Sequence, residues 1–270
     1  MIKKQELKPK IFCLGLDNNL HEKIKKLGYV SVGLGEDNFN SEWLRDDTGK
    51  NISSKNPYYG EYTFHYWFWK NQLSQIEDNT WVGFCTYRRF WSNKNFINEN
   101  FYDKILKTVP EEWSNYDVIL ADKIDLTHVK WMKVLKYGKR AFLNNPKSIF
   151  KKFRNIKFQF ELNHGVGNLD KAIELLSDDD KADFKKFVLE NTSFNQCNLF
   201  ICRSKTLLES YYKTIFNWLE KCEKEFGFDH HSYGKVRIYG FLAERFLPYW
   251  FNKNAKVLEW PIIFNDLRKK

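Results

Sequence analysis

The stretch WVGFCTYRRFW, Trp81 to Trp91, decides how the fold of this chain is interpreted. Its first five residues are apolar or aromatic, as in a strand buried inside a sheet. The next four, Thr86 to Arg89, are polar or charged. Ligands of open α/β sheets bind at the carboxyl ends of the strands. The segment therefore predicts a core strand whose end carries two adjacent arginines toward a ligand.

Predicted strands and helices alternate on both sides of this segment. Short strands are predicted at residues 10–16, 29–35, 116–122 and 194–204. Helical patterns lie at residues 21–28, 61–76, 101–109, 169–190, 207–227 and 234–251. Such alternation indicates an α/β protein with a Rossmann-type, mostly parallel sheet flanked by helices, and with further helices near the C-terminus. Because we find no internal repeat, we expect one domain over residues 1–270.

Composition and charge limit the class of protein and of partner. The chain has 270 residues, enough for a substantial core, and its 18% aromatic content is untypical of disordered chains. Its formal net charge of +10 indicates an anionic partner, which could be a phosphate-bearing ligand, a nucleic acid or an acidic membrane surface. No RNP-like motif is present, so we expect no nucleic-acid partner.

Cysteine usage and hydropathy bear on the compartment. The five cysteines form no CxxC pair, which favours a reducing environment and hence the cytoplasm. No apolar run approaches the ~20 residues of a membrane span. A signal peptide has an apolar stretch after its basic residues, and the first ten residues contain none, so no signal peptide is expected.

Several kinds of site lack their motifs. GxGxxG, GxxxxGK[ST] and GxSxG are absent, and no two of the six histidines stand at HxxxH spacing. Asp122 and Asp125, which follow the predicted strand at 116–122, are an alternative site for a Mn²⁺ or Mg²⁺ ion. The run Asp178 to Asp180 is better explained as helix capping. The sequence therefore does not firmly indicate any cofactor, and it does not favour a divalent metal.

Arg88 and Arg89 have two interpretations. Surface arginines usually form solvated ion pairs. However, these two directly follow an apolar strand at the edge where such sheets bind ligands, and guanidinium groups pair bidentately with phosphate oxygens. Two arginines could then neutralise a pyrophosphate.

Four blocks together resemble a known bacterial family. They are DDTGKNISSKNPYYGEYTFHYWFWKN (46–71), WVGFCTYRRFW (81–91), FNQCNLFI (194–201) and YGFLAERF (239–246). The family, long catalogued as a domain of unknown function, occurs in capsule and lipopolysaccharide O-antigen loci, and its characterised members include galactofuranosyltransferases. The resemblance covers nearly the whole chain. Thr86 replaces the family's histidine before YRR, and Phe64-His65 replaces an alanine-leucine pair, which puts the identity of the sugar in question.

The resemblance implies a nucleotide-sugar-dependent glycosyltransferase of GT-A-like architecture, with a UDP-linked donor as first choice. In several GT-A families, a helix leads into a strand that ends in an Asp-x-Asp metal motif, and TYRR stands at that place here. Arg88 and Arg89 would then replace or assist a metal in stabilising the leaving diphosphate. The donor-binding part would be roughly residues 8–125, and the acceptor side roughly residues 126–270.

Further roles follow from the same resemblance. Glu244 is the first choice for a general base if the reaction inverts, although it could equally pair with Arg245. His164 could approach the acceptor, although it is more simply a loop residue, and Glu61 could simply complement a helix dipole. Retention and inversion both stay open. The expected nucleotide-sugar-binding residues are Asp47, Asn51, Glu61, His65, Lys70, Tyr87, Asn195 and Asn198.

The expected acceptor is a hydroxyl of a capsular or lipopolysaccharide glycan, and this glycan is expected to be lipid-linked. Basic residues concentrated at 130–157 suit an anionic membrane face, so a peripheral position on the inner face of the bacterial inner membrane is expected. A merely solvated surface explains them equally well. The alternative function is a non-catalytic polysaccharide- or nucleic-acid-binding protein. A nucleotide-sugar hydrolase would need an acidic metal cluster that the sequence lacks.

Overall fold

The computed structural model describes residues 7–35, 38–94, 100–128, 139–229 and 233–269. A central mixed sheet holds the fold together, with strand order β10-β6-β9-β4-β1-β2-β3. Four neighbouring pairs in this order are parallel, and only β9 runs against its neighbours, β4 and β6. The strands are β1 (Lys10–Gly15), β2 (Val30–Gly33), β3 (Leu44–Arg45), β4 (Val82–Thr86), β6 (Val118–Ala121), β9 (Phe200–Cys202) and β10 (Val257–Trp260).

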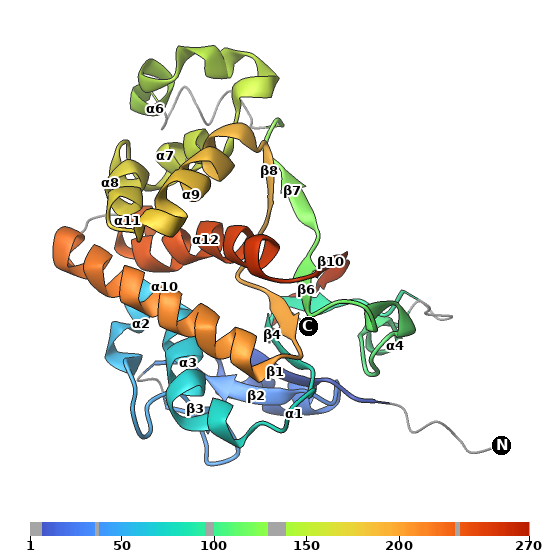
Figure 1. The fold of residues 1–270 in the computed structure, drawn as a ribbon. Helices are drawn as coiled ribbons and strands as arrows, with labels where there is room; N and C mark the ends of the chain where they lie inside the picture. The colour runs from blue at the N-terminus through green and yellow to red at the C-terminus, as the bar shows by residue number, and fades with distance from the viewer. Residues whose placement is uncertain (1–6, 36–37, 95–99, 129–138, 230–232, 270) are drawn as a thin grey trace.

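One smaller strand pair extends this sheet, and another forms a sheet of its own. The strand β5 (Arg89–Trp91) turns back from β4 and pairs antiparallel with β11 (Ile262–Phe264). The strands β7 (Lys123–Asp125) and β8 (Ser193–Asn195) form a separate two-stranded sheet, which leads from the central sheet toward the helices drawn at the top of Figure 1.

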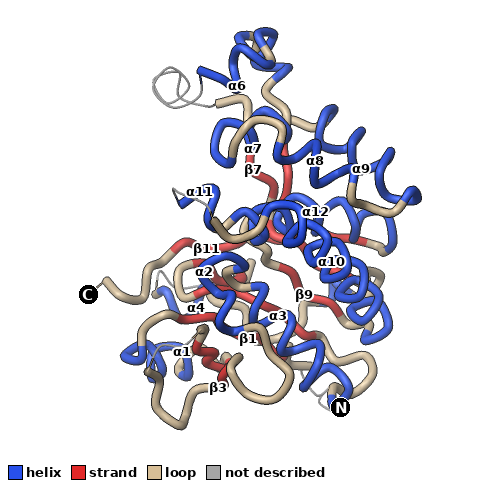
Figure 2. The backbone as a smooth tube through the Cα atoms, turned by 90° about the vertical axis from the view of Figure 1, so that its left-hand side faces the viewer, coloured by secondary structure: helices blue, strands red, loops and turns tan. Residues whose placement is uncertain are grey.

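Some helices cover the central sheet, and others, including α6 and α7, form a group at the top of Figure 1. The helices are α1 (His21–Lys25), α2 (Asn56–Tyr59), α3 (Tyr62–Trp67), α4 (Phe101–Lys104), α6 (Lys139–Asn144), α7 (Ile156–His164), α8 (Asn168–Glu174), α9 (Asp178–Glu190), α10 (Lys205–Phe226), α11 (Tyr233–Val236) and α12 (Ile238–Asn254). In Figure 2, α6 and α7 lie at the end of the molecule away from β1 and β3. No helix in the described part of the chain is both long and apolar enough to cross a membrane.

The sheet is buried on both faces, as its apolar strands predict. Phe12 and Leu14 of β1 point into a core formed with α3, α10 and α12, whereas Ile11 and Cys13 point into a second core on the opposite face. This alternation follows from the two-residue period of a strand, and burial of both faces is typical of a parallel sheet covered by helices. The α/β prediction, GT-A-like with a mostly parallel sheet, is confirmed at the level of the fold.

Three predicted elements were wrong in their extent. The strand predicted at 194–204 is two strands in different sheets, because Cys197 and Asn198 adopt φ values of 72° and 52° and turn the chain between β8 and β9. The helix predicted at 101–109 is the single turn α4, since Ile105 instead bridges Ser92 in extended conformation. The helix predicted at 169–190 is two helices, with the three aspartates in the first turn of α9.

Candidate active site

A cavity of about 200 Å³, called here the arginine cavity, opens at the carboxyl end of β4. Thr86 ends this strand and pairs antiparallel with Arg89, the first residue of β5. The tight reversal between them places Arg88 and Arg89 on the cavity wall. A buried strand therefore ends beside two arginines on a cavity wall, at the edge of the sheet that the sequence pattern indicated. Their role in ligand binding stays a prediction.

Neither arginine has a salt bridge with any residue in the described ranges. Arg88 lies 5.2 Å from the ring centre of Tyr87, and its buried Nε atom has no hydrogen-bond partner there. Arg89 lies 5.7 Å from the ring centre of Phe264. Both guanidinium groups are partly buried. Buried donors without partners are uncommon in folded proteins, which favours an anionic ligand for Arg88.

Glu61 forms one carboxylate wall of the arginine cavity. It accepts hydrogen bonds from Asn198 Nδ2 at 3.0 Å and from Arg237 Nη2 at 3.4 Å. Asn198 reaches Glu61 from the left-handed turn between β8 and β9, and its amide also donates to the carbonyl of Gly240 at 3.3 Å. A side chain at Gly240 would meet the carbonyl oxygen of Tyr59 at 2.9 Å, so glycine lets α12 approach the site closely.

Glu244 forms the second carboxylate wall and is held at both oxygens. Its Oε1 atom accepts the backbone N–H of Cys197 at 2.6 Å, and its Oε2 atom accepts from Arg245 Nη1. Burial lowers the pKa of Arg245, and the adjacent Glu244 carboxylate opposes that shift. Burial, followed by the charge of Glu244, raises the pKa of the Cys197 thiol to about 12. The cavity is therefore lined by a protonated thiol, which is a poor nucleophile.

A second cavity of about 360 Å³, called here the glutamine cavity, lies on the other side of Glu244. Glu244 and Phe241 line both cavities. Gln159 accepts from Arg245 Nη2 at 2.6 Å, and Gln196 lies in the turn before β9. The ring of His164 stacks on Phe241 at 4.0 Å between centres. Glu244 and Phe241 thus form a wall shared by the arginine cavity and a cavity lined mainly by amides and rings.

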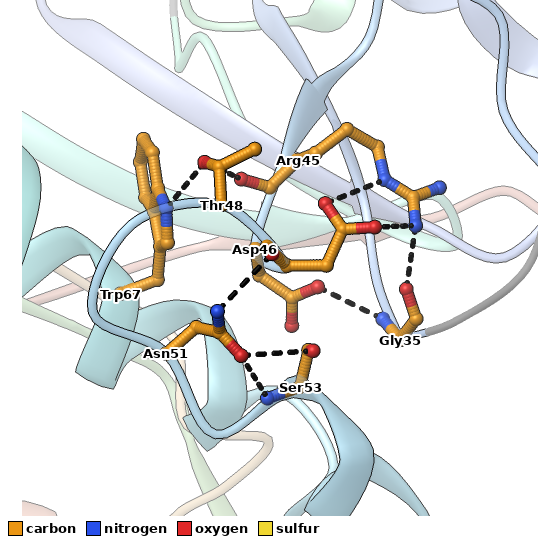
Figure 3. Close-up of polar contacts among 8 residues, drawn as sticks. Gly35, Arg45, Asp46, Thr48, Asn51, Ser53 and Trp67 are labelled. Carbon is orange, nitrogen blue, oxygen red and sulfur yellow. Dashed lines mark hydrogen bonds and ion pairs between the residues drawn. The ribbon is translucent and has the colours of Figure 1, made fainter.

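The loop between β3 and α2 is held by its own side chains (Figure 3). Arg45 pairs with Asp47 at 2.7 Å and donates to the carbonyl of Gly35 at 2.6 Å, which ties the loop to the end of β2. Buried Asp46 accepts the N–H of Gly35 at 2.9 Å. Asn51 donates to the carbonyl of Asp47 and accepts from Ser53. Asp47 and Asn51, both predicted to contact the nucleotide, are thus engaged within the loop.

Four other predicted binding residues do not line the arginine cavity. His65 is fully buried among aromatic rings and bonds Tyr212, and burial lowers its pKa to about 3. Tyr87 is buried in the second core. Asn195 donates to the carbonyl of Ala121 at 2.6 Å and so joins the two sheets. Lys70 stacks on Trp69, 3.1 Å from its ring centre, in a separate groove beside α10.

The alternative metal site at Asp122 and Asp125 stays a prediction. Asp125 accepts two hydrogen bonds from Thr127, which lower its pKa, and burial raises the pKa of Asp122. Within the described residues, the cluster whose ligand atoms come close enough for a metal is instead His21 with Glu22 and Glu42, and both glutamates are exposed. This cluster lies outside both cavities.

Sequence reasoning missed several residues of the two cavities. Arg237, Gly240 and Phe241 all come from the first turns of α12 and the residue before it, beside the predicted Glu244. Their spacing at i, i+3, i+4 and i+7 is a helical-face signal that could have found them. The contribution of Cys197 is a backbone N–H, which has no sequence signature.

Residues 18–255 match a family described as a domain of unknown function, DUF4422. The chain belongs to this family. It is also similar to the solved apo structure of WbbM, a bifunctional glycosyltransferase, with 21% sequence identity and a TM-score of 0.63. The match covers 95% of this chain and 45% of WbbM, so the chain spans less than half the length of that protein. No curated protein matches the sequence.

Proposed function

We propose that this protein is a glycosyltransferase that moves a sugar from a nucleotide diphosphate sugar, UDP-linked as first choice, to a hydroxyl group of a glycan. The observation that carries the proposal is the arginine cavity. It places two arginines without salt bridges, together with two anchored carboxylates, at the carboxyl end of β4. The fold that it shares with WbbM supports the same class of reaction.

Arg88 and Arg89 are the proposed diphosphate-binding residues. Negative charge grows on the leaving diphosphate as the bond from the sugar breaks, and fixed cations in a partly buried site stabilise that charge. The carboxylates of Glu61 and Glu244 each have an arginine partner and a second hydrogen-bond donor. Their charges are already compensated, which favours direct binding of the diphosphate by the arginines over binding through a divalent ion.

Glu244 is the proposed general base because it lies between the two cavities. The donor would occupy the arginine cavity and the acceptor the glutamine cavity. The acceptor oxygen would attack the anomeric carbon, the bond from that carbon to the diphosphate oxygen would break, and the acceptor proton would pass to the Glu244 carboxylate. Such a single displacement inverts the anomeric carbon. Arg245 acts as a positioning residue, since it fixes the Glu244 side chain.

The acceptor that we propose is a lipid-linked capsular or lipopolysaccharide glycan at the cytoplasmic face of the membrane. Support comes from the family resemblance in the sequence and from the exposed lysines of residues 147–152. The amides and stacked rings of the glutamine cavity suit a sugar, because amides bond hydroxyl groups and rings pack against the apolar face of a pyranose or furanose.

A thermal-shift panel tests the donor site. UDP, GDP, CDP and dTDP are each added with EDTA or with Mn²⁺ to the wild type, Arg88→Ala, Arg89→Ala and the control Arg203→Ala. Arg203 lies at the opposite end of β4, 5.5 Å from the ring centre of Trp81. We expect one nucleotide to raise the Tm in EDTA, and we expect only the two cavity variants to lose that shift.

Two outcomes would contradict the proposal. If the Tm rises only with Mn²⁺, the diphosphate is bound through a metal, and the role given to the arginines is wrong. If no nucleotide raises the Tm of the wild type under either condition, the nucleotide-sugar site itself is wrong.

A further inference from the structure

Exposed apolar side chains gather on the segment that follows the described start of α6. Leu143, Ile149 and Phe150 are 76%, 53% and 62% exposed. Eight large hydrophobic residues are exposed in the described ranges, and these three lie within eight consecutive positions. Single exposed apolar residues are ordinary, but a group of them on one segment marks an interaction surface.

The backbone beneath these side chains is well anchored. Buried Arg154 donates to the carbonyls of Ser148 at 3.0 Å, Thr127 at 2.5 Å and Ile149 at 3.2 Å. On the inner side of α6, Ala141 packs against Phe158 and Leu162 of α7. The exposed apolar side chains therefore project from a backbone that is held in place by hydrogen bonds and packing.

The same surface is strongly basic. Residues 139–160 contain seven lysines and arginines and no aspartate or glutamate. Arg154 is buried and Lys157 pairs with Asp170 at 2.7 Å, so both are used internally. Four exposed cations, Arg140, Lys147, Lys151 and Lys152, have no salt bridge with any described residue. Together with Leu143, Ile149 and Phe150, they form what is called here the basic apolar patch.

We propose that the basic apolar patch seats the protein on an anionic lipid bilayer. Apolar side chains enter the boundary between headgroups and acyl chains, while lysines and arginines contact lipid phosphates, and anionic lipids strengthen the contact. A lysine can also extend its charged end from an apolar surface toward the phosphates. Charge complementarity selects this occupant, because four unpaired cations would repel a second copy of the same patch.

The patch lies next to the proposed acceptor side of the molecule. Helix α7 carries Gln159 in the wall of the glutamine cavity and packs on α6 through Phe158 and Leu162. In Figures 1 and 2, α6 and α7 lie together at one end of the molecule. A bilayer under the patch would bring a lipid-linked acceptor near this cavity. Membrane binding itself does not depend on the proposed function.

Vesicle co-sedimentation tests the patch. The full chain is mixed with vesicles of phosphatidylcholine alone, or of equal parts phosphatidylcholine and phosphatidylglycerol. The apolar variant is Leu143→Ser/Ile149→Ser/Phe150→Ser, and the charge variant is Lys147→Glu/Lys151→Glu/Lys152→Glu. The controls are Leu189→Ser and Lys185→Glu/Lys186→Glu, which change exposed residues of α9.

We expect binding only to the anionic vesicles, and we expect added salt to weaken it. Each lysine near an anionic surface contributes about fivefold to binding, so the charge variant should lose on the order of a hundredfold. The apolar variant should also lose binding, while the controls retain it. The Tm of each variant, with and without the stabilising nucleotide, checks that the fold and the donor site are intact.

Three results would overturn the membrane proposal. Equal binding to both vesicle types would exclude recognition of anionic lipid. Unchanged binding of both patch variants would place the contact elsewhere, and no binding by the wild type would remove the contact altogether. Light scattering after gel filtration gives a further check. If the wild type is a dimer and only the apolar variant is a monomer, the patch joins two copies of this chain.

Discussion

Asp46 provides a test of the structure that needs no ligand. Its side chain is fully buried at the start of the loop after β3, and its Oδ2 atom has no hydrogen-bond partner in the described residues. Burial raises its pKa from 3.8 to about 6, although the Thr63 side chain, the Gly35 N–H and the charge of Arg45 oppose the shift. The fold therefore favours the protonated form of this carboxyl group.

The sign and size of the effect on stability follow from that pKa. A carboxyl group with a raised pKa contributes stability that is fully present below pH 3.8 and is lost as the pH rises through about 6. A shift of about two pKa units corresponds to about 3 kcal/mol. Asp46→Asn keeps an oxygen that can accept the Gly35 N–H, but it cannot ionise. Relative to this variant, the wild type should lose about 3 kcal/mol in its free energy of unfolding between pH 3 and pH 7.

Urea denaturation, followed by tryptophan fluorescence at several pH values, measures this difference. Taking wild type minus variant at each pH cancels the titration of all other groups, so the remaining slope belongs to Asp46. The reasoning fails if the difference stays flat between pH 4 and pH 7, or if the wild type gains stability relative to the variant as the pH rises.

Two further predictions concern the core and the site. Burial lowers the pKa of His65 from 6.5 to about 3. The stability that this residue contributes is therefore present above pH 6.5 and is lost on acidification, by about 5 kcal/mol in total. In urea titrations, the wild type should lose stability relative to His65→Phe as the pH falls from 6.5, and an opposite slope would contradict this. Glu244→Gln should lower the kcat of transfer at least a hundredfold while the nucleotide still raises the Tm, and a variant of nearly normal kcat in a sugar-transfer assay would exclude Glu244 as the base.

Strand positions were predictable wherever a single physical requirement fixes the residue type. The strands β1, β2, β4 and β6 are buried on both faces, so each is a short apolar run that the sequence reveals. The strands β10 and β11 were not predicted. They are only four and three residues long, and β10 contains Glu259. They stand on either side of Pro261 and become strands by pairing with β6 and β5. Such pairing depends on distant partners that no local pattern specifies.

The candidate site was predictable in its charges and not in its geometry. Glu61, Arg88, Arg89, Asn198 and Glu244 were all predicted from the sequence, and the structure brings them to one cavity. The binding roles of these residues stay predictions. The sequence did not show which of Glu61, His65 and Lys70, all on one predicted helix, face the cavity.

Position on the helix that begins with α3 decided which of those side chains face the site. Glu61, just before the helix, faces the arginine cavity, His65 one turn later points into the core, and Lys70 lies on the outer face of a π-helical turn. A uniform helical period could not place Lys70, because the π turn at Phe68–Gln72 changes the register. Likewise, nothing in the sequence indicated that Asn195 ends β8 whereas Asn198 lies within the left-handed turn that follows.

The balance of charge around the two cavities argues for an anionic ligand. Glu61 is paired with Arg237, and Glu244 with Arg245, so each glutamate is already neutralised by an arginine of the same region. Arg88 and Arg89 remain, two positive charges that no described carboxylate compensates by a salt bridge. Partly buried charges of like sign that lie side by side without salt bridges reduce the stability of a fold. A bound diphosphate would supply the missing negative charge, and for that reason nucleotide binding should raise the Tm even without a metal.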